Sequence, residues 1–243
     1  MHLLKKTIHS YIDTISVPFE LIIIDNGSTD GSKGIIKKLC KNNPNCNSIF
    51  LPGNRGGRAL NLGLKMAKAK LLHVSENDLT YKSGWDQKML RAFRKIPKLG
   101  QLSLFAPFKK ENTTKVVEGD CVIYIMNSNV GTSSMFRREI WDKGIRWDNI
   151  GSGYKFPNDY AFSKAVKEVG YLVARPDETV VINHGHQIDE YKRNISYYIE
   201  NYRSKPWLGI QCLRNRLQRA GYKLVKNNST QSGYDIVPIK KNK

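Results

Sequence analysis

The sequence predicts an α/β protein in which short buried strands alternate with helices. Residues 19–24 form an apolar run rich in isoleucine, which is typical of a strand buried on both faces. The run ends at Asp25-Asn26-Gly27-Ser28, where turn-forming residues begin, and residues 33–39 follow with a helical pattern. Residues 71–74 repeat this pattern of a buried strand followed by acidic residues. Open α/β sheets bind ligands at the carboxyl ends of their strands, so we expect the functional site there.

The other elements follow from the same periodicities. Helices are expected over residues 3–12, 59–67, 83–95 (capped by Ser83), 161–169, 191–202 and 207–217. Strands are expected over residues 48–51, 100–106, 171–174 and 179–182, with a hairpin over 114–117 and 121–126. Residues 129–138 are expected to run from a strand into a helix that ends near Gly144, and residues 227–233 to form a polar linker.

The composition suits a globular protein with one sizeable core. The chain has 243 residues, of which 40% are hydrophobic and 25% charged. No apolar run approaches the roughly 18 residues of a membrane span, and no signal peptide is evident. The four cysteines, Cys40, Cys46, Cys121 and Cys212, show neither metal-ligand spacing nor a dense disulfide framework. We therefore expect free thiols and a cytoplasmic protein.

The net charge of +19 is the outstanding bulk property. Residues 191–243 carry +10 and residues 1–190 carry +9, so the C-terminal part is much more basic per residue. A basic surface attracts phosphate groups of a sugar nucleotide, an anionic lipid or a nucleic acid. No zinc-finger spacing, ribonucleoprotein motif or heptad repeat accompanies the charge, so nucleic acid is the partner we least expect.

Several motifs together resemble one known family. Residues 25–32, DNGSTDGS, resemble the Asp-Asp-Gly-Ser-x-Asp signature of family 2 glycosyltransferases of the GT-A fold, with Asn26 replacing the second Asp. Residues 54–63 resemble the second donor-site segment of that family, and the ordered set covers roughly residues 3–186. The resemblance implies a GT-A-type, mainly parallel mixed sheet flanked by helices. It also implies a nucleotide-sugar donor, a glycan or other hydroxyl acceptor, and Mn²⁺ or Mg²⁺.

The resemblance places the donor at two loops and one strand. A glycine-rich loop before a helix presents free N–H groups to anions, and an arginine adds further donors to a diphosphate. The alternative is a glycine-rich turn with a solvated arginine, and for residues 129–138 a close-packed strand. The residues expected to bind the nucleotide sugar are Asp25, Asn26, Gly56, Gly57, Arg58, Asn77 and Ser133.

Two acids after the strand at residues 71–74 are candidate metal ligands. Glu76 and Asp78 lie two residues apart, so an extended backbone points both to one side, and their oxygens suit Mn²⁺ or Mg²⁺. The pair resembles the Asp-x-Asp motif of the family, with Glu76 in place of the first Asp. The resemblance also implies a closing histidine, with His184 the first choice and His186 the second.

Asp159 is the candidate general base. A glycine-rich stretch, residues 151–158, delivers it to the start of a helix, and the resemblance implies an acidic base at this place, with Asn158 replacing a Glu. The competing interpretation is that Asn158 or Asp159 caps the helix. The two roles are compatible.

The chain departs from the family at its start, where it opens in a helix and the usual first strand is missing. Three explanations stay open: the sequence is truncated, it has an alternative start, or another segment replaces the strand. Residues 234–239 are one candidate to fill the gap. The expected domains are a catalytic domain over residues 1–186 and a basic helical extension over 187–243. The basic helix at 207–217 either packs on the protein or lies on an anionic membrane surface.

The predicted function is therefore metal-dependent glycosyl transfer, by an inverting single displacement with Asp159 as base. Two alternatives stay open. The substitutions at Asn26, Glu76 and Asn158 allow a non-catalytic protein of the same fold, and the charge alone allows a nucleic-acid-binding protein. The predicted location is cytoplasmic, with peripheral contact at a membrane surface as an addition.

Overall fold

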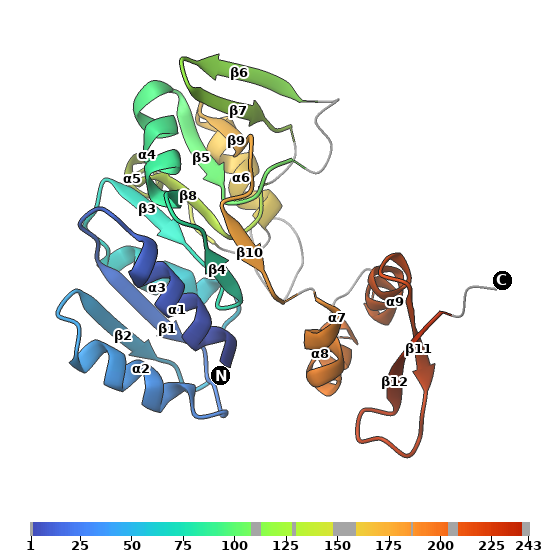
Figure 1. Cartoon of the computed structure of the whole chain (residues 1–243). Helices are drawn as coiled ribbons and strands as arrows, with labels where there is room; N and C mark the ends of the chain where they lie inside the picture. Colours follow the sequence, from blue (N-terminus) through green and yellow to red (C-terminus); the bar gives the residue numbers. More distant parts are fainter. Residues whose placement is uncertain are drawn as a thin grey trace. The chain divides into compact units, whose positions relative to one another are not determined.

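The computed structural model describes two compact units, Met1–Ile182 and Asn183–Lys243 (Figure 1). The structure describes residues 2–107, 113–127, 130–147, 159–185, 187–203 and 209–239. The predicted boundary between residues 186 and 187 stays a prediction.

The elements expected from the sequence are present in these residues. The helices are α1 (His2–Thr14), α2 (Ser32–Lys41), α3 (Arg58–Met66), α4 (Trp85–Lys95), α5 (Arg138–Asp142), α6 (Asp159–Glu168), α7 (Ile188–Arg193), α8 (Ile195–Arg203) and α9 (Gly209–Arg219). The strands are β1 (Leu21–Asp25), β2 (Cys46–Phe50), β3 (Leu71–Val74), β4 (Leu79–Tyr81), β5 (Leu99–Ser103), β6 (Thr114–Glu118), β7 (Cys121–Ile125), β8 (Ser134–Arg137), β9 (Leu172–Pro176), β10 (Val181–Asn183), β11 (Tyr222–Lys226) and β12 (Tyr234–Pro238).

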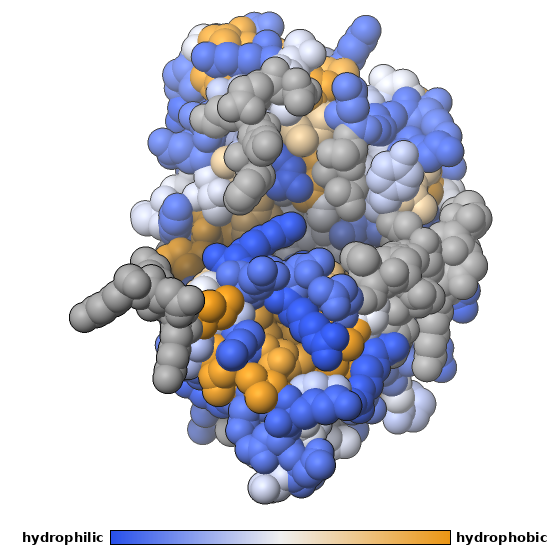
Figure 2. Space-filling view, turned by 90° about the vertical axis from the view of Figure 1, so that its right-hand side faces the viewer, coloured by the Kyte–Doolittle hydropathy of each residue, from blue (hydrophilic) through white to orange (hydrophobic). Residues whose placement is uncertain are grey.

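The second unit has a core of its own. Its buried residues are Tyr191, Tyr198, Ile199, Tyr202, Leu213 and Leu217, and apolar side chains of the β11–β12 hairpin pack against them. Hydrophilic side chains predominate on the face of the molecule shown in Figure 2, with smaller hydrophobic areas between them. None of the described helices is long and apolar enough to cross a membrane.

Two expectations for this unit were wrong. β12 pairs antiparallel with β11, from Tyr222 opposite Pro238 to Lys226 opposite Tyr234, so residues 234–239 do not fill a gap in the main sheet. Residues 227–233 are the turn of this hairpin rather than a linker, with the Asn227 N–H donating to the Gly233 carbonyl at 3.0 Å. β11 was not predicted, because its five residues include two lysines and do not alternate strictly between apolar and polar.

The main sheet has six strands in the order β3-β8-β5-β9-β7-β6. β8 is antiparallel to both β3 and β5, whereas β5 and β9 are parallel. β3, β5 and β9 therefore run in the same direction, and their carboxyl ends share one edge of the sheet. This edge is called the site edge below. The predicted α/β class with a mixed sheet and flanking helices is confirmed.

Helices pack on both faces of this sheet. On one face α4 packs against Leu102 and Ile123, and on the other α6 packs against Val173. Gly100 of β5 allows the end of α6 and the residue before β9 to approach the strand closely. A Cβ added at Gly100 would lie 2.4 Å from the Cβ of Tyr171 and 2.9 Å from Cγ1 of Val166. α6 and β9 are thereby fixed against β5.

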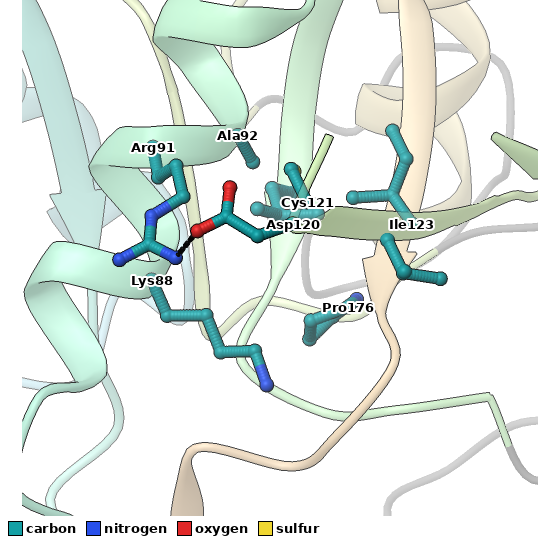
Figure 3. Close-up of a pocket in the computed structure, with 9 residues that line it drawn as sticks. Lys88, Arg91, Ala92, Asp120, Cys121, Ile123 and Pro176 are labelled. Atoms are coloured by element: carbon teal, nitrogen blue, oxygen red, sulfur yellow. Dashed lines mark hydrogen bonds and ion pairs between the residues drawn. The ribbon is translucent and has the colours of Figure 1, made fainter. Parts of the chain in front are cut away.

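A small pocket of ≈ 40 Å³ lies between α4 and β7 (Figure 3). Charged side chains at its mouth pair with one another: Arg91 with Asp120, and Lys88 with Asp177 at 2.9 Å. None of the predicted site residues lines it. We assign this pocket no role in the predicted chemistry.

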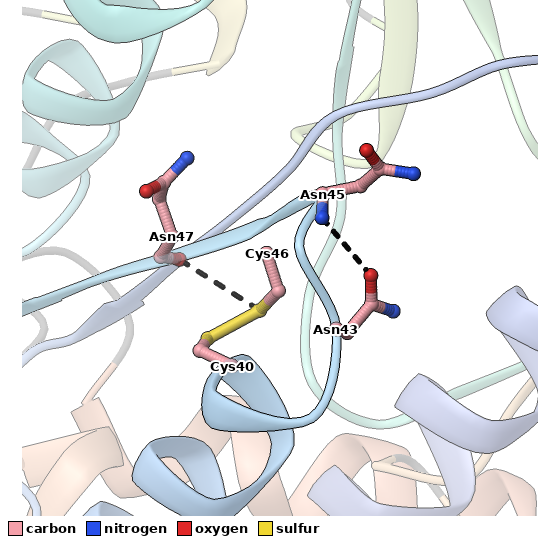
Figure 4. Close-up of a disulfide and its surroundings, with 5 residues drawn as sticks. All are labelled: Cys40, Asn43, Asn45, Cys46 and Asn47. Atoms are coloured by element: carbon pink, nitrogen blue, oxygen red, sulfur yellow. Dashed lines mark hydrogen bonds between the residues drawn. A yellow bond between two sulfur atoms is a disulfide. The ribbon is translucent and has the colours of Figure 1, made fainter.

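β1 and β2 form a separate parallel pair covered by α1 and α2. Leu21–Ile24 are half-buried, with helices on both faces of the strand: Ile23 packs with α1 and α2, and Ile22 and Ile24 lie next to Gly63 of α3. Cys40 and Cys46 form a disulfide between the end of α2 and the start of β2 (Figure 4). The expectation of four free thiols was therefore wrong for this pair, whose Cα atoms a tight turn brings to 4.7 Å.

Two smaller expectations also differ from the structure. Ser83 does not cap α4, because the cap position is Gly84 in the left-handed conformation, with φ of 75° and no side-chain cap bond. The helix expected over residues 191–202 is interrupted at Asn194, so two shorter helices form. β4, immediately after Asp78, was not predicted because three residues give too short a pattern.

Candidate active site

The site edge brings Glu76 and Ser133 together. Glu76 follows β3, and Ser133 precedes the adjacent antiparallel strand β8, so the two residues face each other across the pair. The Ser133 hydroxyl donates to Glu76 Oε2 at 3.1 Å, and the Glu76 N–H donates to Ser133 Oγ at 3.3 Å. Ser133 is 1% exposed and Glu76 is exposed, so a buried hydroxyl orients a carboxylate that still meets solvent.

Asp159 lies at the same edge. It is the first residue of α6, and its Oδ1 accepts a hydrogen bond from the Thr132 hydroxyl at 3.0 Å. Thr132 and Ser133 are neighbours in sequence, so two adjacent hydroxyls hold Asp159 and Glu76. A second hydrogen bond holds α6 against the sheet: one turn after Asp159, the Ser163 hydroxyl donates to Oε1 of Gln101 in β5 at 2.9 Å. A place in the first turn also favours a carboxylate through the helix dipole. Asn158 lies outside the described residues.

Asp25 supplies a buried acceptor at the end of β1. It is 3% exposed, and its Oδ1 accepts the Ser28 N–H at 2.6 Å. Its Oδ2 is buried and accepts no hydrogen bond from the described residues. A buried carboxylate oxygen without a donor loses free energy, about 1–3 kcal/mol, so this atom is suited to an N–H or O–H of a ligand.

Asn26 ties this turn to the glycine-rich loop. Its Nδ2 donates to Asn54 Oδ1 at 2.9 Å and to the Gly56 carbonyl at 3.1 Å, and its Oδ1 accepts the Arg55 N–H at 2.8 Å. A carboxylate at this position has no hydrogens to donate. Asn26 therefore replaces the second Asp of the family signature with a group that links the two loops.

Glycines allow the two loops to meet. Gly27 has φ of 87°, and a Cβ added there would lie 2.8 Å from the Cα of Gly53. Gly57 takes the cap position of α3, and Arg58 is the exposed first residue of that helix. The structure thus brings Asp25, Asn26 and the Gly56–Arg58 segment together, and their role as a donor site stays a prediction.

The predicted metal ligands Glu76, Asp78 and His184 are all among the described residues, with the two acids in the first unit and His184 in the second. Asp78 follows Glu76 by two residues, directly before β4, and Asn77 between them is exposed. No group of three or more His, Cys, Asp or Glu side chains able to hold a metal occurs within the described residues. His184 belongs to the second unit, so its part in metal binding stays a prediction, and His186 lies outside the described residues.

The comparison with protein families agrees with this geometry. The model of glycosyl transferase family 2 matches residues 2–145, which is more than half of the chain. The chain belongs to glycosyl transferase family 2. The match includes every predicted donor-site and acid-motif residue, from Asp25 to Ser133.

Solved structures show the same fold at low sequence identity. A mannosyltransferase from Pyrobaculum calidifontis, in complex with GDP-Man and Mn²⁺, aligns with a TM-score of 0.58 and 14% identity over 90% of this chain and 60% of its own. TarS residues 1–349 from S. aureus gives 0.54 and 18% over 82% and 62%. GalNAc-T7 with UDP, GalNAc and Mn²⁺ gives 0.58 and 12% over 89% and 51%. This glycosyltransferase chain thus spans 51–62% of those three chains. The comparison with curated protein sequences gives no match.

The site of this family 2 glycosyltransferase includes residues that the sequence did not reveal. The Tyr81 hydroxyl donates to Ser75 Oγ at 2.7 Å, and the Ser75 hydroxyl donates to the Glu76 carbonyl at 2.8 Å. His73 Nε2 lies 2.8 Å from the same Tyr81 oxygen, and burial lowers the pKa of His73 to about 4. His73 is therefore neutral at pH 7. Neither these residues nor Thr132 has a sequence signal, because the contacts depend on strand pairing.

Proposed function

We propose that this family 2 glycosyltransferase moves a sugar from a nucleotide-sugar donor to an acceptor hydroxyl, with inversion and with Asp159 as the base. The observation that supports it is the pair Thr132–Ser133, whose hydroxyls hold Asp159 and Glu76 at one edge of the sheet. In an inverting displacement the base lies on the acceptor side of the reacting carbon, and the carboxylate that holds the cation lies on the side of the departing diphosphate. This arrangement suits transfer better than a non-catalytic role.

Asp25 and the linked loops are the proposed nucleoside site. The buried Oδ2 of Asp25 accepts an N–H of the base or a ribose hydroxyl, and Asn26 keeps the Gly56–Arg58 segment next to it. Arg58, exposed at the helix start, is free to approach a phosphate. The complexes of the structural relatives with GDP-Man or UDP support a nucleotide at this fold.

Glu76 and Asp78 fit a hard divalent cation. Both supply carboxylate oxygens, which Mn²⁺ and Mg²⁺ prefer, and two protein ligands leave positions for diphosphate oxygens and water. Such a cation, when bound, neutralises the charge of the departing nucleoside diphosphate. Ser133 orients Glu76 for this role, and we include His184 as a further candidate ligand.

Asp159 is proposed to take the proton of the acceptor hydroxyl. The acceptor oxygen forms its bond to the anomeric carbon as the bond to the diphosphate oxygen breaks, and the nucleoside diphosphate leaves on the opposite side. The Thr132 hydroxyl donates to Oδ1 of Asp159 and so fixes the orientation of the carboxylate. The second oxygen, Oδ2, is then the one proposed to accept the proton of the acceptor hydroxyl. Asn77 and Ser133 are proposed to contact the donor beside this carboxylate.

The second unit is proposed to bring the enzyme to an anionic membrane surface on the cytoplasmic side. Leu213 and Leu217 of α9 are 0% exposed, so the apolar side of this helix is used in the core and is not available for insertion. The exposed side carries Arg214 and Arg219, and Lys223 follows on β11. The expected contact is electrostatic. Sedimentation with phosphatidylserine vesicles should therefore decrease steeply between low and physiological salt, and salt-independent binding would contradict the proposal.

The function is tested with Asp159→Asn. We expect unchanged binding of Mn²⁺ with UDP or GDP, and loss of sugar transfer and of slow donor hydrolysis by 10²-fold or more. Asp142→Asn is the matched control, since Asp142 is an exposed carboxylate at the end of α5. Undiminished turnover by Asp159→Asn would remove Asp159 as the base. An unmodified enzyme that binds nucleotide but processes no donor would favour the non-catalytic alternative.

A further inference from the structure

The helix α1 packs along the short strand β4 (Figure 1). β4 begins directly after Asp78, and a strand edge presents unpaired N–H and C=O groups. On the other side of the strand the Lys82 N–H donates to the Val180 carbonyl at 3.1 Å. The edge toward α1 is closed by side chains instead of by another strand.

Two hydroxyls of α1 accept the N–H groups of this edge. The Leu79 N–H donates to Thr7 Oγ1 at 3.0 Å in a buried bond, and the Tyr81 N–H donates to Ser10 Oγ at 3.0 Å. Thr7 and Ser10 lie three residues apart and so share one face of the helix. Leu79 and Tyr81 lie two residues apart, so their backbone N–H groups lie on the same edge of the strand.

The hydrogen bond that Thr7 accepts lies at the end of the segment that carries Glu76 and Asp78. Residues 75–78 are called the acid loop here. The amide of Leu79 is the peptide group that joins Asp78 to β4, so Thr7 fixes the C-terminal end of the loop. The other end is fixed by the Tyr81 hydroxyl through Ser75, which in turn donates to the Glu76 carbonyl.

We propose that Thr7 is a positioning residue for metal–diphosphate binding: its hydroxyl fixes the Asp78–Leu79 peptide and thereby the spacing of the two carboxylates. This inference rests on the proposed role of Glu76 and Asp78. Residues that orient metal ligands without touching the metal commonly affect its affinity by 10–100-fold. Thr7 is 6% exposed, so water cannot replace its hydroxyl.

The decisive comparison is Thr7→Val against Thr7→Ser. Valine keeps the shape and branching of threonine but accepts no hydrogen bond, whereas serine keeps the acceptor. Thr14→Val is the control on the same helix, because the Thr14 hydroxyl donates to the Ser10 carbonyl of α1, at 2.5 Å, and to no other group of the described residues. Tyr81→Phe is a second variant that releases the other end of the loop and keeps the ring.

Two measurements that need no turnover are made on the full chain. The first is Mn²⁺ binding in the presence of UDP or GDP, followed by the loss of the free Mn²⁺ signal in electron paramagnetic resonance. We expect Thr7→Val and Tyr81→Phe to weaken it about 10–100-fold, and Thr7→Ser and Thr14→Val to leave it within about twofold. The second is amide hydrogen exchange of Leu79 without metal, which should become faster in Thr7→Val alone.

The outcomes separate this inference from the proposed function. If the unmodified chain binds Mn²⁺–nucleotide and Thr7→Val binds it equally well, the positioning role is refuted. Unchanged exchange at Leu79 in a folded Thr7→Val variant refutes it as well. If the unmodified chain shows no metal-dependent nucleotide binding while Leu79 responds to Thr7→Val, the proposed metal site fails and the contact stands only as packing. If Thr7→Val does not fold, Thr7→Ala, which also lacks the acceptor, takes its place in both measurements, and unchanged values in that variant refute the positioning role.

Discussion

Restoring the family signature at Asn26 should weaken this protein. In Asn26→Asp the side chain keeps its acceptor for the Arg55 N–H but loses both donors, the one to Asn54 Oδ1 and the one to the Gly56 carbonyl. The new carboxylate would then face two acceptor oxygens at the distances that now hold hydrogen bonds, 2.9 and 3.1 Å. The linkage between the two donor-site loops should therefore be lost.

The magnitude follows from two hydrogen bonds in a partly exposed place. Each contributes about 1 kcal/mol net, and solvent screens the added repulsion, so the expected loss is about 2 kcal/mol of unfolding free energy. A flip of the Asn54 amide would not restore the balance, because Asn54 Oδ1 also accepts the Gly56 N–H at 2.7 Å. The loop closest to Asp25 should loosen, and nucleotide affinity should fall with it.

Urea denaturation and nucleotide titration of Asn26→Asp give both quantities. Asn43→Asp is the matched control, since Asn43 Oδ1 only accepts the Asn45 N–H at 3.1 Å (Figure 4) and aspartate accepts equally well. We expect the control to shift stability by less than about 0.5 kcal/mol. An Asn26→Asp protein as stable as the unmodified chain, with equal nucleotide affinity, would refute the linking role of the amide.

Three further predictions concern backbone conformation, pH and the metal site. Gly27→Ala should lose about 2 kcal/mol or more in urea denaturation, because it adds a contact with Gly53 to the strain of φ 87°, whereas Gly144→Ala (φ 86°, open space) should lose only about 1 kcal/mol; equal losses would contradict the close approach. His73 has its pKa lowered by burial to about 4, so the unfolded chain binds a proton below pH 6.5 that the folded chain binds only near pH 4. Unfolding free energy should thus be at its full value above pH 6.5 and fall by about 1.4 kcal/mol per pH unit below it, and a His73→Gln variant with the same pH slope would contradict this. Ser133→Ala should weaken Mn²⁺–nucleotide binding about tenfold by releasing Glu76, and unchanged binding in the same titration would show that the bond does not orient the carboxylate.

The sequence was sufficient for the strands that end in the site. β3 matches its predicted range, because a short, mainly apolar run that ends in acidic residues is typical of a buried strand and too short for a helix. β4 and β11 were missed for physical reasons: β4 has three residues, and β11 has two lysines among five residues without a strict alternation of apolar and polar residues. The disulfide between Cys40 and Cys46 was missed because the turn between them has no diagnostic spacing.

The candidate site residues were predicted where residue type and position in the chain agree. Asp25 and Glu76 are candidates because carboxylates stand out directly after an apolar strand, and Asp159 because it follows a glycine-rich stretch at the start of a helix. The supporting hydroxyls of Thr132 and Ser75 were not predicted, because nothing in the sequence around a serine or threonine indicates which distant residue it will bind. The bond from Leu79 to Thr7 joins residues 72 positions apart, and only the packing of α1 on β4 explains it.

The proposed chemistry requires that the acid loop bind the diphosphate of the donor through a divalent cation. Calorimetric titration of UDP and GDP into the unmodified chain and into Asp78→Ala, each with and without Mn²⁺, tests it most directly. We expect the unmodified chain to bind nucleotide only when Mn²⁺ is present, and Asp78→Ala to lose at least tenfold in this affinity at unchanged stability. Nucleotide binding that is equal in both proteins and indifferent to Mn²⁺ would contradict it.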